Sequence, residues 1–531
     1  MIYTSERIDF KLEIPDVSIT EYALRHADRL ADKPALIDGP SGRTLTYGQL
    51  AGGIKKVAGG LYARGFRKGD VLAIYCPNMP EYALVFNAVA SVGGINTTVN
   101  PLYTAAELAK QLNDSKAKFL VTVPPFLDKA LEAANNSSVE EVFVFGDAEG
   151  ASSFSELLST EQPAPVVAID PKNDLVVLPY SSGTTGLPKG VMLTHHNLVA
   201  NLCQVDGLEE EKRMGEGEII LAMLPFFHIY GMIVVMKLAL AGGATVVSMP
   251  RFDMEEFLGL VQRYKATTLP LVPPVVLGLA KSPLVDQFDL SSVKTIFCGA
   301  APLGRELSME TSQRIGCPVT QGYGMTEASP VTHLSSMDPE KSREGAIGKV
   351  IPDTEVRLVD VKSGKDCAQG EDGELWIRGP QIMRGYLNQP EETAECIDTE
   401  GWYHTGDVGY VDEDGFFFIV DRVKELIKYK AMQVSPAELE ALLVTHPEIL
   451  DTAVIPCPDE EAGEIPKAIV VLKDPASASD ELAEKIMAFV ADNVAPHKRV
   501  RLLDFAEQIP KSASGKILRR VLVEAERSRS T

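Results

Sequence analysis

The sequence lacks the patterns that mark zinc-binding, secreted and organelle-targeted proteins. Its 531 residues include seven cysteines without a C-x-x-C pair and eight histidines without an H-E-x-x-H pattern, which are the spacings of common zinc sites. The first twenty residues contain no basic region followed by an apolar one, and the chain ends without a peroxisomal signal. We therefore expect a reduced, cytoplasmic protein without structural zinc.

Positive charge and long apolar runs are also scarce. Lys and Arg number 51 against 74 Asp and Glu, a formal net charge of −23, which argues against a nucleic-acid or anionic-membrane partner. The most apolar long window, residues 229–247, contains Lys237 and two adjacent glycines. This window predicts a buried helix followed by a strand rather than a membrane span.

The length and the apolar pattern predict an α/β protein with more than one domain. Up to about residue 337, helical patterns alternate with short apolar runs that are typical of buried strands. These runs are residues 71–75, 118–123, 141–145, 245–249 and 295–298. We predict two related α/β sheet layers, then a small β subdomain over about 345–420, while the polar stretch 94–101 is interpreted as a loop.

The strongest domain boundary falls after a strand-like run at residues 416–420. A charged segment follows it, then a helix from about Ser435-Pro436 and a compact α+β tail. The sequence therefore predicts an N-terminal domain over 1–420 and a C-terminal domain over 421–531.

The stretch from Tyr180 to Gly190 has the composition of a phosphate-binding loop. Its glycines allow close approach of the backbone, its hydroxyl groups donate hydrogen bonds, and Lys189 adds one positive charge. It is not a Walker A loop, because Lys189 follows Pro188 and an apolar strand follows in place of a helix. Taken alone, such a stretch is also compatible with a solvent-exposed turn.

Five further segments, in a fixed order, accompany this loop: residues 224–231, 321–327, 401–407, 421–428 and 510–516. Together the six motifs resemble the signature of the adenylate-forming enzymes, which include acyl-CoA synthetases, adenylation domains of peptide synthetases and beetle luciferases. The resemblance implies an ATP-dependent carboxylic acid:CoA ligase that forms an acyl-adenylate and then a thioester, releasing pyrophosphate and AMP.

The resemblance also implies how ATP and Mg²⁺ are held. Thr326 would bind the α-phosphate and Glu327 would carry Mg²⁺. Tyr323 would lie against the adenine, and Asp407 would accept from both ribose hydroxyls. The residues implied for ATP are Ser181, Ser182, Gly183, Thr184, Thr185, Lys189, Gly299, Ala300, Ala301, Gln321, Gly322, Tyr323, Thr326, Asp407, Arg422 and Lys516.

Catalysis in such enzymes is divided between two sets of residues. By resemblance, Lys516 would bridge the carboxylate and the α-phosphate during adenylation, and Lys428 with Gln433 would act on the adenylate carbonyl during thioester formation. His228 and Thr326 complete the predicted catalytic residues. Because Lys516 and Lys428 both belong to the tail, the tail would re-dock between the half-reactions about a hinge at 421–422. Lys430 and Ala431 would contact CoA.

The acid is less clearly indicated than the mechanism. The chain lacks the aspartate that binds an amino group in peptide-synthetase domains, and it most resembles 4-coumarate:CoA ligases and bacterial cinnamate-activating relatives. The resemblance implies an acyl pocket of Ile229, Tyr230, Ile233, Phe297, Gly299, Gly324, Pro330 and Val331.

Two departures from that pattern bear on function. Phe297 and Ile233 replace a lysine and an asparagine common in the plant enzymes, so a phenolic hydroxyl would lack a partner. Ala431 stands where glycine is usual. A medium-chain fatty acyl-CoA ligase and an adenylating enzyme that loads a carrier protein stay open as alternatives.

Overall fold

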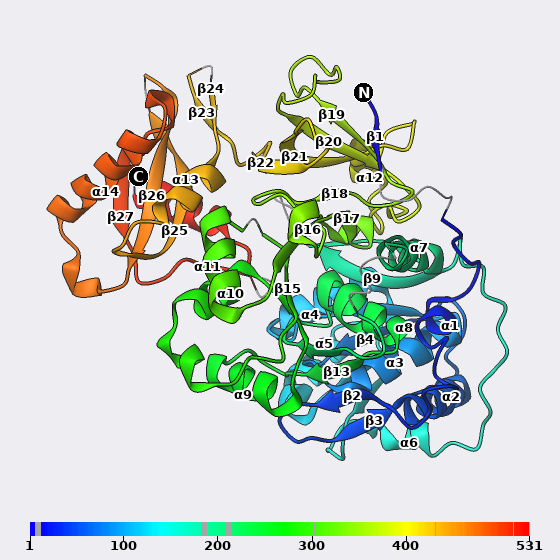
Figure 1. Ribbon diagram of the computed structural model, residues 1–531. Helices are drawn as coiled ribbons and strands as arrows, with labels where there is room; N and C mark the ends of the chain where they lie inside the picture. Colours follow the sequence, from blue (N-terminus) through cyan, green and yellow to red (C-terminus); the bar gives the residue numbers. More distant parts are fainter. Residues whose placement is uncertain are drawn as a thin grey trace.

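Figure 1 shows a computed structural model in which a large N-terminal domain lies beside a small C-terminal one. The structure describes residues 1–5, 12–181, 188–208, 214–301, 303–430, 432–459, 461–512 and 515–529. The predicted class is confirmed: two α/β sheets share one buried core, a β subdomain follows, and the tail has a sheet and core of its own.

The first sheet has the strand order β10-β9-β5-β4-β6-β7-β8, with β11 paired to β9. Its middle strand, β4, is buried at every residue, as expected where helices cover both faces of a parallel sheet. The strands are β4 (Val71–Tyr75), β5 (Ile95–Thr98), β6 (Ala117–Thr122), β7 (Glu141–Val144), β8 (Ser152–Ser153), β9 (Leu175–Ser181), β10 (Lys189–Gly190) and β11 (Leu193–Thr194).

The second sheet has the order β18-β17-β16-β15-β14-β12-β13-β2-β3. Strands β14, β15 and β16 run parallel, so their carboxyl ends share one edge, where ligands bind in α/β sheets. The strands are β2 (Pro34–Asp38), β3 (Thr44–Thr46), β12 (Ile219–Ala222), β13 (Thr245–Ser248), β14 (Thr268–Leu271), β15 (Thr295–Cys298), β16 (Val319–Gly324), β17 (Val331–Leu334) and β18 (Lys349–Val350).

Helices of the large domain begin at the capping residues that their sequences provide. The hydroxyls of Ser18, Thr46, Thr104 and Thr194 each accept a backbone N–H in a capping box. The helices are α1 (Ile19–Ala23), α2 (Tyr47–Ala63), α3 (Pro80–Ser91), α4 (Ala105–Ser115), α5 (Leu127–Asn135), α6 (Ser155–Leu158), α7 (His195–Asp206), α8 (Leu238–Gly242), α9 (Met254–Tyr264), α10 (Pro273–Lys281) and α11 (Arg305–Ile315).

Residues 229–247 form a buried helix and then a strand, as predicted. A π-helix, η3 (Tyr230–Lys237), continues into α8, which ends at Gly243 in the left-handed conformation before β13. Short 3₁₀ turns occur at η1 (Pro124–Phe126), η4 (Pro283–Gln287), η5 (Thr326–Ala328) and η6 (Pro339–Lys341). Within the described ranges, no helix has both the length and the apolar composition needed to cross a membrane.

The β subdomain leads into the tail after β22, the strand that contains the predicted hinge residues 421–422. The subdomain sheet has the order β1-β19-β20-β21-β22. It comprises β1 (Tyr3–Thr4), β19 (Glu355–Val359), β20 (Gly373–Arg378), β21 (Tyr403–Val411) and β22 (Phe417–Arg422), with helix α12 (Pro390–Cys396) nearby. The chain leaves this sheet after Arg422 and enters the tail sheet at Ile427.

The tail sheet has the order β24-β23-β26-β25, with β27 parallel to β26. Its strands are β23 (Ile427–Tyr429), β24 (Met432–Val434), β25 (Ile449–Asp459), β26 (Gly463–Leu472) and β27 (Leu502–Phe505). Its helices and turns are α13 (Pro436–Leu443), η7 (Pro475–Ser477), α14 (Asp480–Asn493), η8 (Pro496–Lys498) and α15 (Arg519–Arg529).

One predicted loop is wrong. Residues 95–98 form β5, a strand between β4 and β9. The polar side chains are compatible with burial because their donor groups find partners: Asn96 Nδ2 donates to the carbonyls of Phe86 and Val176, and Thr97 Oγ1 donates to that of Leu178.

Candidate active site

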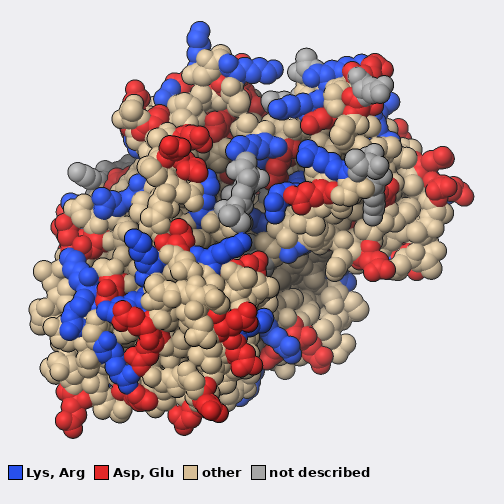
Figure 2. Space-filling model, turned by 180° about the vertical axis from the view of Figure 1, so that it is seen from behind, with Lys and Arg blue, Asp and Glu red and all other residues tan. Residues whose placement is uncertain are grey.

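The candidate site lies where the carboxyl edge of the second sheet meets the β subdomain and a loop from the tail. The tail loop that carries Lys516 reaches the start of α10: a methyl group on Gly515 would lie 3.4 Å from Val272 Cγ2 and 3.5 Å from Pro274. Viewed from behind, the molecule is hollowed beneath the C-terminal domain, and Lys and Arg side chains lie beside the hollow (Figure 2). The tail is therefore docked with Lys516 toward the large domain.

A chain of three polar side chains occupies the predicted ribose and adenine side. The Tyr323 hydroxyl, on β16, donates to Asp407 Oδ2 at 2.5 Å, and Arg422 Nε donates to Oδ1 of the same carboxylate at 3.1 Å. Burial, with a smaller contribution from the charge of Asp407, raises the pKa of Tyr323. The phenol therefore stays protonated and acts as the donor. Asp407 and Arg422 face each other on β21 and β22, which places the hinge arginine beside the predicted nucleotide site.

A second polar group surrounds Glu327, the predicted Mg²⁺ residue. Glu327 is 8% exposed, and its Oε1 accepts from Ser181 Oγ at 2.9 Å and from the Tyr386 hydroxyl at 3.0 Å. Lys189 Nζ lies 4.9 Å from the centre of the Tyr386 ring. The end of β9, the turn after β16 and the segment before α12 are thus brought together around one carboxylate.

This carboxylate fits Mg²⁺. Among the described residues, no cluster of three or more His, Cys, Asp or Glu is placed to hold a metal. Mg²⁺ does not require one, since it commonly binds one or two carboxylates and takes its remaining ligands from phosphates and water.

His228 and Lys516 lie on opposite sides of the domain junction. Burial, with a smaller contribution from the charge of Lys516, lowers the pKa of His228 to about 3. This imidazole is therefore neutral at pH 7. Burial and then the charge of Arg422 also lower the pKa of Lys516, while Asp407, Glu327 and Glu425 oppose that shift. The charges of three predicted ligand residues, Arg422, Asp407 and Glu327, thus act on the ammonium group of Lys516.

Two of the predicted acyl residues, Tyr230 on η3 and Phe297 on β15, contact each other. The Tyr230 hydroxyl donates to the Phe297 carbonyl at 2.9 Å, and the two rings meet edge to face with centroids 5.9 Å apart. Because its hydroxyl is occupied, Tyr230 offers its ring rather than a polar group to a ligand. Ile229, Ile233, Pro330 and Val331 are buried.

The two pocket glycines have packing reasons for their lack of a side chain. A methyl group on Gly299 would lie 3.1 Å from the Tyr230 ring, and one on Gly324 would lie 2.0 Å from the Pro330 carbonyl oxygen. Gly322 is similarly restricted, because its methyl group would lie 2.7 Å from Phe297. These glycines allow close approach of the chain around Tyr230 and Phe297.

The second predicted catalytic set is not at this junction. Lys428 is exposed on the hairpin β23–β24, at the top of the C-terminal domain in Figure 1. Its backbone N–H donates to Glu464, and its cross-strand partner is Gln433. Lys430 has φ 55 in the turn and pairs with Glu461 in the same domain. The structure therefore brings together the Lys516 set and leaves the Lys428 set at a distance.

Several predicted residues lie outside the described part of the chain. Ser182, Gly183, Thr184 and Thr185 of the phosphate loop and Ala431 of the CoA set are among them, as are residues 513–514 beside Lys516. Of the remaining predicted nucleotide residues, Ala300 has φ 71, and Gln321 Oε1 accepts the Leu303 N–H at 3.3 Å.

Sequence reasoning missed Tyr386 and the pair Thr268 and Thr295. Tyr386 belongs to no motif that was singled out, and only its contact with Glu327 reveals it. Thr268 and Thr295 are opposed on β14 and β15, and they line a cavity of about 20 Å³ together with Phe297 and Val331. Both threonine hydroxyls are buried and have no hydrogen-bond partner among the residues that the structure describes.

Comparison with known proteins shows the family of this chain. Residues 24–387 match the model of the AMP-binding enzyme family, and residues 438–516 match the AMP-binding enzyme C-terminal domain. The chain belongs to the AMP-binding enzyme family. The enzyme class predicted from the motifs, an AMP-forming acid–thiol ligase, is confirmed with it.

Relatives of this AMP-binding enzyme extend over nearly the whole chain. It is 44% identical to 4-coumarate–CoA ligase 2 of Petroselinum crispum, over 97% of this chain and 96% of that protein. It is 43% identical to 4-coumarate–CoA ligase of Pinus taeda, over 97% of each chain.

One solved structure with the same fold is an anthranilate CoA ligase in complex with anthranoyl-AMP. It has a TM-score of 0.89 and 28% sequence identity, and the match covers 99% of this chain and 100% of that one. Another is ATP-bound MatB of Rhodopseudomonas palustris, with a TM-score of 0.86, 28% identity, and coverage of 97% and 100%.

Proposed function

We propose that this enzyme joins 4-coumarate, cinnamate or a related aryl or phenylpropenoyl acid to CoA. The observation that carries this proposal is that neutral His228, whose pKa the charge of Lys516 helps to lower, accepts the Tyr230 backbone N–H at 3.3 Å, where the Tyr230 ring meets that of Phe297 edge to face. The identity to 4-coumarate–CoA ligases supports the same acid class. The cytoplasmic location expected from the sequence stays a prediction, as does the exact domain boundary at 420/421.

In the first half-reaction, a carboxylate oxygen of the acid attacks the α-phosphorus of ATP and pyrophosphate leaves. Lys516 is placed to offset the negative charge that the two anions bring together. Asp407, oriented by Tyr323 and Arg422, would hold the ribose, and Glu327 would hold Mg²⁺. The metal, when bound, neutralises phosphate charge.

In the second half-reaction, the CoA sulfur attacks the acyl carbon and AMP leaves with the bonding electrons. Lys428 and Gln433 are the residues we assign to this step. Because Lys428 is exposed on the far hairpin in the docked state, the tail would turn about residues 421–422 to bring it to the adenylate. Ser435 Oγ donates to Asp421 Oδ2 at 2.8 Å, and this hydrogen bond would move together with residues 421–422 when the tail turns.

A panel of acids, scored for pyrophosphate release with and without CoA, tests the proposal. We expect release with cinnamate and 4-coumarate, and thioester only when CoA is present. A clear preference for medium-chain fatty acids would contradict the aryl class and identify the enzyme as a medium-chain fatty acyl-CoA ligase. Thioester formation on a carrier protein but not on CoA would show that the acyl acceptor is a carrier protein and not CoA.

We predict that 4-coumarate is preferred over cinnamate by no more than about tenfold, roughly 1.4 kcal/mol. Phe297 and Ile233 are apolar, so a buried phenol lacks a partner from either of them. The measurement is the ratio of kcat/KM for the two acids. A larger preference would contradict the prediction and would indicate Thr268 and Thr295 as the acceptors, which the Thr268→Val and Thr295→Val variants would then test.

We predict that Ala431→Gly accelerates thioester formation by up to about tenfold and leaves adenylation unchanged. Ala431 stands where relatives usually have glycine, and Lys430 directly before it has φ 55, a conformation that glycine adopts most readily. A methyl group here would also narrow the path of the CoA thiol. Single-turnover rates of each half-reaction in both proteins decide the question, and an unchanged thioester rate would show that Ala431 is neutral.

A further inference from the structure

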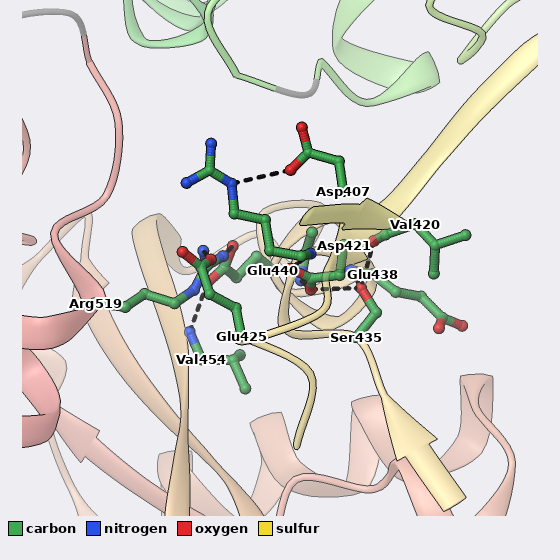
Figure 3. Close-up of polar contacts among 11 residues, drawn as sticks. Asp407, Val420, Asp421, Glu425, Ser435, Glu438, Glu440, Val454 and Arg519 are labelled. Atoms are coloured by element: carbon green, nitrogen blue, oxygen red, sulfur yellow. Dashed lines mark hydrogen bonds and ion pairs between the residues drawn. The ribbon is translucent and has the colours of Figure 1, made fainter. Parts of the chain in front are cut away.

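One guanidinium, that of Arg519, joins three segments of the tail. Arg519 opens helix α15, and its Nη1 donates to Glu425 while its Nη2 donates to Glu440 Oε2 at 2.5 Å. Glu440, on α13, also accepts the Val454 N–H of β25 at 2.7 Å through its other oxygen. Figure 3 shows the two carboxylates and Arg519 turned toward one another, just below the hinge residue Asp421.

These ion pairs are shielded from water. The side chains of Arg519, Glu440 and Glu425 are 15%, 12% and 22% exposed. Burial raises the pKa of Glu440 to about 7, although Arg519 acts to lower it. A partly buried carboxylate of this kind depends on its cation, because removing one partner leaves the other charge uncompensated.

The position of the cluster in the chain is informative. Arg519 follows Lys516 by three residues, and Glu425 precedes Lys428 by three residues. The Glu425 N–H also donates to the Arg422 carbonyl at 2.9 Å, in the turn that leaves the hinge. One side chain therefore connects the segment of Lys516 to the segment that leads from the hinge to Lys428.

We propose that Arg519 is a positioning residue for both half-reactions: its ion pairs with Glu425 and Glu440 hold the two lysine-bearing segments at a fixed separation. The tail can then turn about the hinge as one body and present either lysine accurately. This inference rests on the proposed function. An error of about 1 Å in a reacting group can lower a rate by about a hundredfold, which is why such a brace would matter.

The same helix offers a matched control. Farther along α15, Glu526 accepts two hydrogen bonds from Lys467 Nζ at 2.8 Å each. Lys467 is 8% exposed and Glu526 is 13% exposed, so this pair is as shielded as the first. The pair anchors α15 to β26, and Lys467 keeps a second carboxylate, Asp504, at 2.8 Å when Glu526 is neutralised. The Glu526→Gln variant therefore reports on general stabilisation of the tail.

The test compares Arg519→Gln, Arg519→Lys, Glu425→Gln and Glu526→Gln in the full-length enzyme. Adenylation is followed as single-turnover pyrophosphate release, and thioester formation is followed from a supplied acyl-adenylate. We expect Arg519→Gln to lower both rates by at least about tenfold, with little change in the KM for ATP. Arg519→Lys, which keeps the charge but not the fork, should recover part of both rates.

Two outcomes would overturn the proposal. One is loss of a single half-reaction in Arg519→Gln with the other preserved. The other is an equal loss in Glu526→Gln at a matched melting temperature, which would make the effect one of general stability. If Arg519→Gln does not fold, Glu425→Gln takes its place, because it removes only one of the two ion pairs. The rates of adenylation and of thioester formation are then measured in that variant, with the same two outcomes overturning the proposal.

A readout that needs no substrate separates this inference from the proposed function. The N–H groups of Gly515 and Leu518 donate to the carbonyls of Ser512 and Pro510, and that of Glu425 donates to Arg422. We expect faster amide hydrogen exchange at both places in Arg519→Gln but not in Glu526→Gln. Wild-type inactivity toward every acid would refute the proposed function alone, whereas unchanged exchange would refute the brace alone.

Discussion

Replacing Lys516 with alanine should lower acyl-adenylate formation by about a thousandfold, while a chemically supplied adenylate still reacts with CoA. The charges of Arg422, Asp407, Glu327 and Glu425 all act on the pKa of this lysine, and its own charge would offset that of a carboxylate approaching a phosphate. That charge is needed in the first half-reaction only. Single-turnover pyrophosphate release and thioester formation from the adenylate measure the two steps separately.

Lys511→Ala is the control for this prediction. Lys511 belongs to the same tail segment, but its Nζ pairs with Asp451 Oδ2 at 2.6 Å within the tail. It should leave both rates within about threefold of wild type. An equal loss of both half-reactions in Lys516→Ala would contradict the division of labour between the two lysines.

The second large effect is expected from Asp407→Ala, which should weaken AMP binding by about a hundredfold, roughly 2.7 kcal/mol. The variant removes the predicted acceptor for the ribose hydroxyls and leaves the Tyr323 hydroxyl and the Arg422 guanidinium without their carboxylate. Calorimetric titration with AMP measures the loss directly and does not depend on the identity of the acid.

Tyr323→Phe provides the comparison for Asp407→Ala. It removes the hydroxyl that orients Asp407 but keeps the ring proposed to face the adenine, so AMP binding should weaken by no more than about tenfold. AMP affinity in Asp407→Ala within about threefold of wild type would show that the ribose is held elsewhere.

Some parts of the fold follow from local pattern. Residues 71–75 are a continuous apolar run, and they form β4, buried on both faces. Thr194 caps α7 because its hydroxyl, close in sequence to the free N–H groups of the first turn, accepts from Asn197. Local pattern failed at β5, because Asn96 and Thr97 are polar in sequence and become compatible with a buried strand only through carbonyls supplied by other elements.

The sequence by itself determined the family and the enzyme class of this protein, and its motifs predict the phosphate loop, Glu327, Asp407 and the lysines as site residues. The tertiary structure decided how these groups are held. Tyr386 contacts Glu327 from 59 positions away in the chain, and Arg519 reaches Glu440 and Glu425 across 79 and 94 positions. Such contacts have no local signature, because they depend on how distant elements pack, whereas a motif concentrates its chemistry within a few consecutive residues.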